Sequence, residues 1–359
     1  MEKNLKKFYL NKKILITGHT GFKGAWLTAV LLRYKAKIIG ISKDIPTNPS
    51  LYKILGLKKK IKDYRFDLSN FEKFKKVLTT EKPDIIFHLA AQAIVSKSYK
   101  EPKRTWSSNL ISTLNLLEIL RKKKKNCLAV IITSDKCYLN IEKKGGYKEN
   151  DRLGGNDHYS ASKACTEILF NSYFKSNLHK NSKLRIVTAR AGNVIGGGDW
   201  AQDRLIPDCV SKWSKNKIIK IRNPNSTRPW QHVLEAIYGY LFLAFELKNN
   251  KKINGLSFNF GPSERRSKPV KYILNEFKKK WKKIKWKYEK TFTFKETNSL
   301  RLNSHLSKKL LDWKCMLTFS EMISLVSSWY LVYYKEKNKD LFEFTNTQIN
   351  KFEKKFFNR

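Results

Sequence analysis

Four polar residues follow an apolar run near the middle of the chain, and they are the first candidates for chemistry. The run from Leu128 to Ile132 is short, β-branched and bounded by polar residues, which predicts a buried strand. The next residues are Thr133, Ser134, Asp135 and Lys136. Taken alone, this tetrad is typical of a solvated loop with an ordinary ion pair. As a site, it would offer a hydroxyl, an acid and a base at the end of one strand.

A tyrosine and a lysine in "YSASK" supply a second candidate pair. Tyr159 and Lys163 are spaced i, i+4, so both side chains lie on one face of a helix. An ammonium one turn away favours the phenolate, so we expect Lys163 to lower the pKa of Tyr159 and to make it a base near neutrality. Because this spacing is common by chance, a surface pair is the alternative. A dinucleotide-binding fold around it would favour the catalytic interpretation.

A glycine pattern indicates such a fold. Gly18, Gly21 and Gly24 lie between a short apolar strand, Lys13–Thr17, and a helical pattern. Glycines at this position permit a tight turn and a close approach of backbone N–H groups to a pyrophosphate at the helix N-terminus. The expected cofactor-binding residues are Gly18, His19, Thr20, Gly21, Phe22, Lys23 and Gly24. Lys23 either adds a charge to the pyrophosphate or is solvated.

The adenosine end of the cofactor is less clearly specified. The acidic residue that often ends the second strand is missing, and Ser42 and Lys43 stand there instead. Lys43 could face a 2′-phosphate, which leaves the choice between NAD and NADP open at this point. Asp67, followed by Leu68, is placed to accept a hydrogen bond from the adenine amine. The alternative for Asp67 is an exposed loop aspartate.

Strands alternate with helices over about 190 residues, which predicts a doubly wound parallel α/β sheet of the Rossmann type. The pattern becomes irregular beyond Asn193. We expect residues 1–192 to form the nucleotide-binding domain, with 228–260 returning to it. Residues 193–227 and 261–340 would form a smaller substrate-binding lobe, and residues 341–359 a basic tail.

Composition limits the class of protein. The chain has 359 residues, of which 41% are hydrophobic and 13% aromatic, so it can bury a large core. It has no run of about 18 apolar residues, and its first residues lack the apolar segment of a secretory signal. Its five cysteines are odd in number and show no CxxC spacing, which argues against a metal site or disulfide framework. These features predict a cytoplasmic protein without a membrane span or a bound metal.

The formal net charge of +44 suggests nucleic-acid binding as an alternative function. Of the 74 basic residues, 14 are arginine and 60 are lysine, and the lysines are spread along the whole chain. Specific recognition of bases and phosphates relies largely on the rigid fork of arginine. The excess is therefore weak evidence for specific nucleic-acid binding, and an AT-rich genome would produce it equally well.

Longer phrases resemble one family. Across about residues 10 to 330 the chain resembles the extended short-chain dehydrogenase/reductase family, the NAD-dependent epimerases and dehydratases. The phrases "GHTGFKGAWL", "TSDKCY", "ARAGNVIGGGDWAQDRLIPD" and "RPWQHVLE" are similar to those of its nucleotide-sugar 4,6-dehydratases. Lys136 stands where the enzymes for CDP-glucose have lysine and those for dTDP- and GDP-sugars have glutamate. Epimerases of the family have small or hydroxyl residues at Asp135 and Lys136.

The resemblance implies a reaction and a set of roles. The reaction is the NAD-dependent removal of water from CDP-D-glucose, which gives CDP-4-dehydro-6-deoxy-D-glucose for deoxysugar and surface-polysaccharide (O-antigen lipopolysaccharide) biosynthesis. The implied catalytic residues are Ser134, Asp135, Lys136, Tyr159 and Lys163. Leu89, Ala90, Ala91 and Gln92 would pass along the cofactor, whereas His88 would be a buried structural residue. Asn193, Asp203, Arg204 and Arg228 would bind the nucleotide sugar.

Assembly and alternative functions follow from the same resemblance. The helices after Trp106 and Tyr159 have more apolar residues than one face needs, so we expect a homodimer built on a four-helix bundle. The alternatives within the fold are a dTDP-glucose 4,6-dehydratase and a 4-epimerase. The alternative from another class is a basic, non-catalytic Rossmann protein that binds nucleic acid.

Overall fold

The computed structural model describes residues 2–263, 267–281, 284–289 and 299–358. Its centre is a parallel seven-stranded sheet with the order β11-β6-β5-β4-β1-β2-β3. The strands are β1 (Lys13–Thr17), β2 (Lys37–Ser42), β3 (Lys62–Arg65), β4 (Ile85–His88), β5 (Cys127–Ile132), β6 (Leu184–Ala191) and β11 (Ser257–Phe260). The strand order reverses between β1 and β4, where such sheets bind ligands. The predicted doubly wound α/β fold is confirmed.

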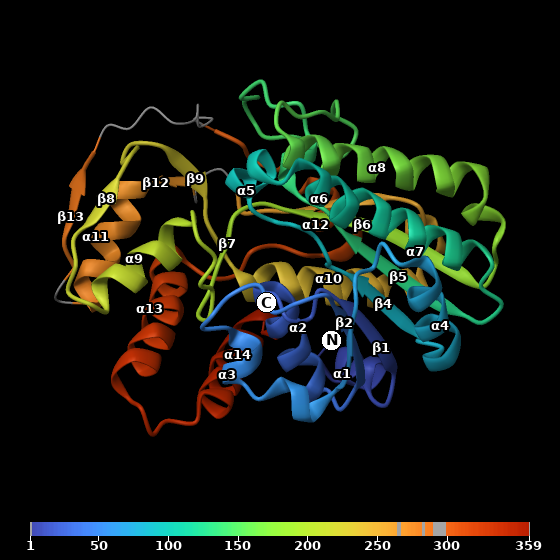
Figure 1. Ribbon diagram of the computed structural model, residues 1–359, viewed down its shortest axis with the longest axis horizontal. Coiled ribbons are helices and arrows are strands. Elements are labelled where there is room, and N and C mark those ends of the chain that lie inside the picture. Colours follow the sequence, from blue (N-terminus) through green and yellow to red (C-terminus); the bar gives the residue numbers. More distant parts are fainter. Residues whose placement is uncertain (1, 264–266, 282–283, 290–298, 359) are drawn as a thin grey trace.

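Each strand of the sheet's centre is apolar on both sides, because helices cover both faces. In β1, Ile14 and Ile16 belong to one core cluster and Leu15 to the other. The first face carries α1 (Glu2–Tyr9), α2 (Phe22–Arg33), α10 (Val233–Asn249) and α14 (Leu341–Phe357). The second face carries α4 (Phe71–Glu81), α7 (Ser112–Arg121) and α8 (His158–Ser176) (Figure 1). The sheet is therefore the middle of three layers.

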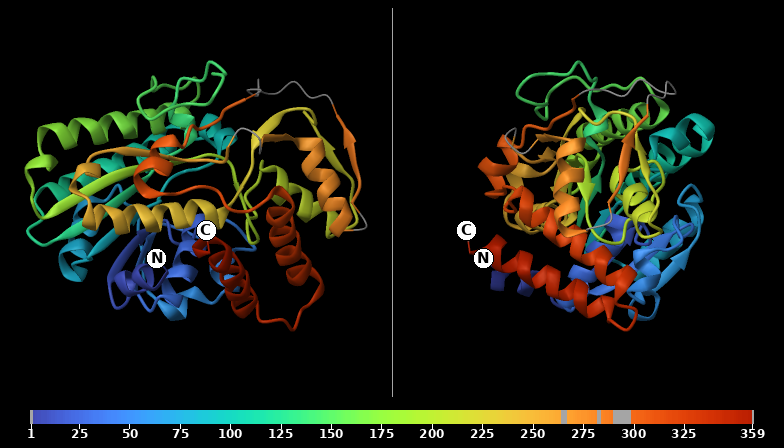
Figure 2. Two further views of the ribbon diagram at one scale, coloured as in Figure 1. Left: turned by 180° about the vertical axis from the view of Figure 1, so that it is seen from behind. Right: turned by 90° about the vertical axis from the view of Figure 1, so that its left-hand side faces the viewer.

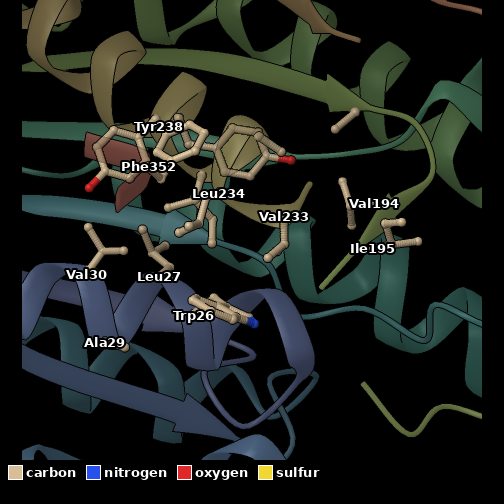
Figure 3. Packing of buried hydrophobic residues seen from close by; sticks show 14 of the residues in the cluster. Trp26, Leu27, Ala29, Val30, Val194, Ile195, Val233, Leu234, Tyr238 and Phe352 are labelled. Atoms are coloured by element: carbon tan, nitrogen blue, oxygen red, sulfur yellow. The ribbon is translucent and has the colours of Figure 1, made fainter. Parts of the chain in front are cut away.

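The packing of α2 on α10 fixes the helix that follows the glycine pattern. Trp26 and Val30 of α2 point toward Val233 and Leu234 of α10, as Figure 3 shows, and all four side chains are buried. The indole Nε1 of Trp26 also donates a hydrogen bond to the carbonyl of Gly197 at 2.9 Å. The N-terminus of α2 is thereby held against the loop after β6 and β7 (Val194–Ile195).

Short helices connect the sheet strands. They are α3 (Leu51–Ile54), η1 (Leu57–Lys60), α5 (Val95–Lys100), α6 (Pro102–Trp106), η3 (Asp135–Cys137), η4 (Leu178–Lys180) and η5 (Lys251–Ile253). The single helix expected from Trp106 to Arg121 is instead interrupted by a five-residue π-helix, η2 (Ser107–Ile111). Ser112 and Thr113 donate hydroxyl bonds to the carbonyls of Ser108 and Asn109 there, a type of back-bonding that distorts helices.

A smaller lobe lies beside the sheet, at the left of Figure 1. Its elements are α9 (Leu205–Trp213), β8 (Ile219–Ile221), β9 (Thr227–Pro229), β12 (Ser267–Pro269), α11 (Val270–Lys280) and β13 (Trp286–Tyr288). β10 (Gln231–His232), α12 (His305–Leu311) and α13 (Phe319–Lys335) connect it to the larger part. Trp213 packs on Phe277 and Trp281, so aromatic side chains form the core of the lobe. The domain boundaries drawn from the sequence stay a prediction.

The segment expected to be a basic tail contains α14, which packs back on the first face of the sheet. Glu353 of α14 is buried and accepts hydrogen bonds from the hydroxyls of Tyr34 and Tyr238, both at 2.7 Å. Lys6 of α1 lies 3.7 Å from the same carboxylate. The two chain ends accordingly lie close together in both views of Figure 2. No helix in the described part of the chain is long and apolar enough to cross a membrane.

Candidate active site

The glycine pattern forms the turn between β1 and α2. Gly18 has a φ of +72°, and a Cβ on it would lie 2.8 Å from the backbone nitrogen of Ala90. A Cβ on Gly24 would lie 2.2 Å from the carbonyl oxygen of Gly18. Both positions therefore exclude any larger residue. Gly21 caps α2 without a side-chain hydrogen bond, and the first turn has no acidic residue, so the helix N-terminus offers N–H donors to an anion.

The other predicted residues of this turn differ in where their side chains point. His19 is fully buried, with Nε2 3.0 Å from Oδ1 of Asp63 and Nδ1 3.0 Å from Oγ of Ser42. Burial lowers the pKa of His19 to about 4, so it is a neutral structural side chain. Thr20 donates its hydroxyl to the carbonyl of Asp44 at 2.7 Å. Only backbone groups of His19 and Thr20 remain for a ligand.

Two further residues of the turn begin α2. Phe22 is half-buried, and its Cζ would lie 3.0 Å from a Cβ on Gly196. Lys23 is half-buried as well. Burial, followed by the charge of Arg204, lowers the pKa of Lys23 to about 8, whereas the charge of Asp135 opposes this. Lys23 thus lies close enough to Arg204 and Asp135 for their charges to change its pKa.

At the adenosine end, the structure pairs two of the residues considered above. Lys43 Nζ lies 2.7 Å from Oδ2 of Asp67, and Oδ1 of Asp67 accepts from the backbone of Ser69 at 3.0 Å. Burial opposes ionisation, but these hydrogen bonds and the Lys43 charge lower the pKa of Asp67. Leu68 is buried, and its carbonyl accepts from Asn115 at 2.9 Å. Lys43 is therefore the ion-pair partner of Asp67.

The segment after β4 runs alongside the glycine turn. Leu89 and Ala90 donate their backbone N–H groups to the carbonyl and the hydroxyl of Thr17, at 3.1 and 3.2 Å. Ala91 is half-buried. Gln92 is buried, and its side-chain amide donates to the carbonyl of Ile94 at 3.0 Å. Gln92 thus shapes the loop with its side chain.

His88, at the end of β4, has the structural character expected of it. It is buried, with Nδ1 2.9 Å from Oγ1 of Thr17 and Nε2 3.2 Å from Oγ1 of Thr113. Burial, assisted by the charge of Lys163, lowers the pKa of His88 to about 3. The ring is a neutral link between β1, β4 and α7.

The tetrad after β5 begins a tight turn, residues 133–138, which is named the catalytic turn here for the candidate residues that it carries. Ser134 caps η3: its Oγ accepts from the backbone of Lys136 at 3.2 Å and donates to Oδ1 of Asp135 at 2.9 Å. Asp135 is 5% exposed, and burial raises its pKa. A Cβ on Gly192 would lie 3.1 Å from Oδ2 of Asp135, so that glycine leaves room for the carboxyl group. Lys136 is half-buried, and its charge partly opposes the effect of burial on the pKa of Asp135.

Helix α8 brings the tyrosine and lysine to this turn. Asp157 caps the helix by accepting from the backbone of Ser160 at 2.9 Å, which sets its start. Tyr159 is 9% exposed and Lys163 5% exposed. The Ser134 hydroxyl lowers the pKa of the Tyr159 phenol, so the structure brings the two candidate groups close together.

The expected effect of Lys163 on Tyr159 is wrong for this structure. Burial raises the pKa of Tyr159 to about 12; the hydroxyl of Ser134 and the charge of Arg204 only partly oppose this. The charge of Lys163 is not among the main influences on the pKa of Tyr159. Burial lowers the pKa of Lys163 itself to about 8. The physical reason is that desolvation of the phenolate outweighs the nearby cations. Desolvation therefore favours the neutral phenol of Tyr159 over the phenolate.

The predicted substrate residues lie on the loop after β6 and on the lobe. Asn193 accepts from the backbone of Gln231 through its carbonyl, at 3.4 Å. Asp203 has a φ of +61° and accepts from the hydroxyl of Ser96. Arg204 precedes α9 and lies 3.1 Å from Asp199. Arg204 also acts on the catalytic candidates, since its charge lowers the pKa of Tyr159.

Arg228, the fourth predicted substrate residue, lies on β9 of the lobe. It pairs with Lys268 of the antiparallel strand β12, and its Nη1 donates to the carbonyl of Thr227 at 3.1 Å. The sheet fixes its backbone, and Pro229 follows it. This position belongs to the lobe, whereas Asn193 continues directly from the sheet.

Two buried charged residues behind the catalytic turn are absent from the sequence-based set. Glu167 and Arg190 form an ion pair of 2.8 Å with exposed fractions of 0% and 1%. Glu167 follows Lys163 by one helical turn, and this spacing was the available signal. Arg190 lies within an apolar strand, where a cation needs a partner that the sequence does not name.

Comparisons with known proteins identify the family of the chain. A model of the family described as GDP-mannose 4,6 dehydratase matches residues 15–326. The chain is 38% identical over 330 residues to a CDP-glucose 4,6-dehydratase of Salmonella typhimurium, covering 90% of this chain and 92% of that protein.

Solved structures show the same fold. An epimerase from Methanothermobacter thermautotrophicus superposes with a TM-score of 0.78 at 20% identity, covering 93% of this chain and 96% of that one. A dTDP-glucose 4,6-dehydratase from Bacillus anthracis, in complex with NAD, has a TM-score of 0.74 at 22% identity, covering 93% and 99%. The extent of the family match and the 38% identical relative decide the question: the chain belongs to the GDP-mannose 4,6 dehydratase family, among the nucleotide-sugar epimerases and dehydratases that its sequence resembles.

Proposed function

We propose that this protein dehydrates CDP-D-glucose to CDP-4-dehydro-6-deoxy-D-glucose with NAD as its cofactor. The observation that supports this most is the convergence of Ser134, Asp135 and Tyr159 at the end of β5, with Lys136 beside them. A 4-epimerase needs no acid and base at C5 and C6. The 38% identical relative is a CDP-glucose 4,6-dehydratase, which supports CDP as the nucleotide.

The residues of the glycine turn fit a dinucleotide. Gly18 and Gly24 leave a cradle that a Cβ would fill, and the N-terminus of α2 directs backbone N–H groups toward it. Lys23 would add a cation beside the pyrophosphate, and Asp67 would accept from the adenine amine. When bound, NAD supplies a hydride acceptor at C4, a hydride donor at C6 and, in its oxidised form, a positive charge.

Tyr159 and Ser134 would act first, at the C4 hydroxyl. Ser134 holds the C4 oxygen by a hydrogen bond while Tyr159 accepts its proton as C4 is oxidised to a ketone. Because burial raises the pKa of Tyr159 to about 12, the phenolate needs more positive charge than the protein alone provides. Arg204 contributes part of that charge.

Asp135 and Lys136 would act second, across C5 and C6. The C4 ketone acidifies the C5 proton, which Lys136 removes as a base, and Asp135 gives its proton to the departing C6 hydroxyl as water. The raised pKa of Asp135 suits a carboxyl group that must hold a proton. Returning the hydride to C6 and a proton to C5 completes the reaction without net oxidation. The overall change is the loss of one water molecule, so the enzyme is a hydro-lyase.

The nucleotide sugar would lie between the sheet and the lobe. The guanidinium of Arg228 would donate two parallel hydrogen bonds to the diphosphate, and Arg204 would supply a second cation. Asn193 and Asp203 would hydrogen-bond the sugar or the nucleotide from the loop after β6. The lobe residues thus set the choice of substrate, and the sheet residues set the chemistry.

The test is to incubate the purified protein and NAD with CDP-, dTDP-, UDP- and GDP-glucose. We expect one product, CDP-4-dehydro-6-deoxyglucose, identified by mass spectrometry as substrate minus water. Preferred turnover of dTDP-glucose, or formation of CDP-galactose without loss of water, would contradict the proposal. Salt-sensitive gel shifts of RNA without any turnover would instead favour the nucleic-acid alternative.

A further inference from the structure

A buried ion pair lies directly behind the catalytic turn and takes no part in the steps above. Glu167 of α8 and Arg190 of β6 are 2.8 Å apart and are 0% and 1% exposed. Removing two charges from water is expensive, and apolar residues of similar size often stabilise a core as well or better. Stability alone is therefore a weak reason for this pair, and its neighbours offer a better one.

Glu167 accepts hydrogen bonds from the first residue after β5, from β6 and from β11. The hydroxyl of Thr133 donates to Oε1, and those of Thr188 and Ser257 donate to Oε2 at 2.9 and 3.1 Å. Burial opposes ionisation, but the charge and hydrogen bond of Arg190 lower the pKa of Glu167. The carboxylate thus stays charged and joins β5, β6 and β11 to helix α8.

Arg190 extends this network to the other end of the catalytic turn. Its Nη1 donates to the hydroxyl of Tyr138 at 2.6 Å and to the carbonyl of Glu149 at 2.9 Å, and its guanidinium stacks 5.0 Å from the Tyr138 ring. Thr133 precedes the reactive residues of the turn and Tyr138 follows them. The ion pair therefore holds the segment that carries Ser134, Asp135 and Lys136 at both ends.

The same pair belongs to the helix that carries the other catalytic candidates. Tyr159, Lys163 and Glu167 follow one another at i, i+4 spacing, so they lie along one face of α8. A shift of this helix along the strand would break the bond between Glu167 and Thr133 and would move Tyr159 relative to Ser134. One ion pair thus sets the position of both catalytic segments relative to each other.

The charge of Glu167 also acts on Lys163. The titratable and charged groups around this ammonium are Glu167 on α8, Cys137 on η3, His88 on β4 and Lys23 on α2. Burial lowers the pKa of Lys163 to about 8, and Glu167 is the first of the charges that oppose this. With both residues present, the charges of Glu167 and Arg190 cancel. Substituting either residue by a neutral one leaves the net charge of the other.

From these contacts we propose that Glu167 and Arg190 are positioning residues. They fix the catalytic turn against helix α8, and the Glu167 carboxylate lies one helical turn from Lys163, where its charge acts on the ammonium. This proposal rests on the proposed function for its kinetic test. The ligand-binding test below does not depend on turnover.

The decisive experiment compares Glu167→Gln with Arg190→Gln. Glu167→Gln leaves the Arg190 charge unbalanced, so the alkaline limb of the pH–rate profile should move down by about one pH unit. Arg190→Gln leaves the Glu167 charge unbalanced, so the same limb should move up by about as much. Fluorescence titration of NADH binding against pH should show the same opposite shifts. A loss of folding alone would move both variants in one direction.

Two further variants separate charge from position and from stability. Arg190→Lys keeps the charge but loses the fork that reaches Tyr138 and Glu149, so turnover should fall about tenfold or more at every pH with the alkaline limb unmoved. Glu353→Gln is the matched control, since it also removes a buried carboxylate that binds two hydroxyls, on α14. It should lower the melting temperature and leave both pH profiles unchanged.

Each result decides the proposal. If Glu167→Gln and Arg190→Gln leave the pH profiles in place, or shift them in the same direction, the proposal is wrong. If the parent protein turns over no nucleotide sugar, the function proposed above fails, and the pH dependence of NADH affinity still tests the ion pair. Opposite shifts in that affinity would support the pair's role even then.

Discussion

At the scale of single residues, Tyr159 is the most direct test of the chemistry. Tyr159→Phe removes the phenol oxygen and keeps the ring, so we expect turnover to fall by about 10² to 10⁴, the usual range for a lost general base. Binding of the nucleotide sugar, measured by calorimetry, should remain near that of the parent. Near-normal turnover in this variant would show that another group accepts the C4 proton.

Lys136 tests the order of the two half-reactions. Lys136→Ala should still oxidise C4 but stall before water is lost, so NADH absorbance should build up in a single turnover. Little solvent deuterium should enter C5. Lys144→Ala removes an exposed lysine nearby and is the matched control. Normal exchange at C5 with normal product release in Lys136→Ala would rule out the base role.

Asp135 links catalysis to stability through its pKa. Burial raises the pKa of Asp135 in the folded state, so its contribution to stability is fully present below the ordinary pKa of aspartate, about 3.9, and is lost as the pH rises through the folded value. Asp135→Asn should therefore melt at a higher temperature than the parent at pH 7 to 8, with little turnover. The difference should shrink as the pH falls toward 4. A lower melting temperature for Asp135→Asn at pH 8 would contradict this reasoning.

The sequence identifies some residues of the site but not how burial changes their pKa values. Spacing alone places Tyr159 and Lys163 on one helix face, and the end of an apolar strand identifies Ser134 and Asp135. Desolvation depends on what covers a side chain, which a single sequence does not contain, so the sign of the Tyr159 shift could not be predicted. For the same reason Glu167 and Arg190 were overlooked, since the two residues meet only after α8 packs against β6.

At the scale of elements, the turn between β1 and α2 carries the next prediction. Gly18→Ala places a Cβ 2.8 Å from the backbone of Ala90 at a φ of +72°, so the turn must deform, and NADH affinity should fall about tenfold or more. Gly56→Ala is the matched control: it has a φ of +60° but nothing within 4 Å of its added Cβ. Fluorescence titration should show parent-like NADH affinity for that control. Equal losses in both variants would indicate general strain.

Helices and strands could be predicted from the sequence where a single hydrophobic periodicity dominates. The strands and the helix from His158 to Ser176 follow from apolar runs and a clear start, because burial on both sheet faces demands them. The π-helix at Ser107–Ile111 and the pairing of the lobe's short strands were not predictable. Their hydrogen bonds depend on hydroxyl back-bonding and on partners far away in the chain, which leave no local pattern.

At the scale of the whole molecule, the outer surface of α7 and α8 bears on assembly. Leu116, Leu117 and Phe170 face the sheet and are buried, whereas Ile111 and Ile168 are 38% and 55% exposed. Two copies that pair these helices would cover the exposed side chains, as expected of a homodimer. Ile168→Glu should then convert a dimer to a monomer in light scattering at micromolar concentration.

A control for this prediction lies on another surface. Ile141 is 73% exposed in the loop after the catalytic turn, so Ile141→Glu adds the same charge away from α7 and α8. It should leave the dimer mass unchanged. A monomer mass for the parent protein would show that these helices have no second copy as their partner.

The contact between α14 and the first face of the sheet has a consequence for how the protein is made. Translation proceeds from the N-terminus, so every residue of the candidate site leaves the ribosome before Glu353 does. Until then the hydroxyls of Tyr34 and Tyr238 lack the carboxylate that accepts from both of them, and the apolar surface of α10 that packs against Phe352 is exposed to water. A chain stopped by a premature termination codon before α14 would contain all of the candidate catalytic groups and would still expose this apolar surface. Chaperones and proteases recognise such surfaces, so docking of α14 would protect this face of the sheet from them.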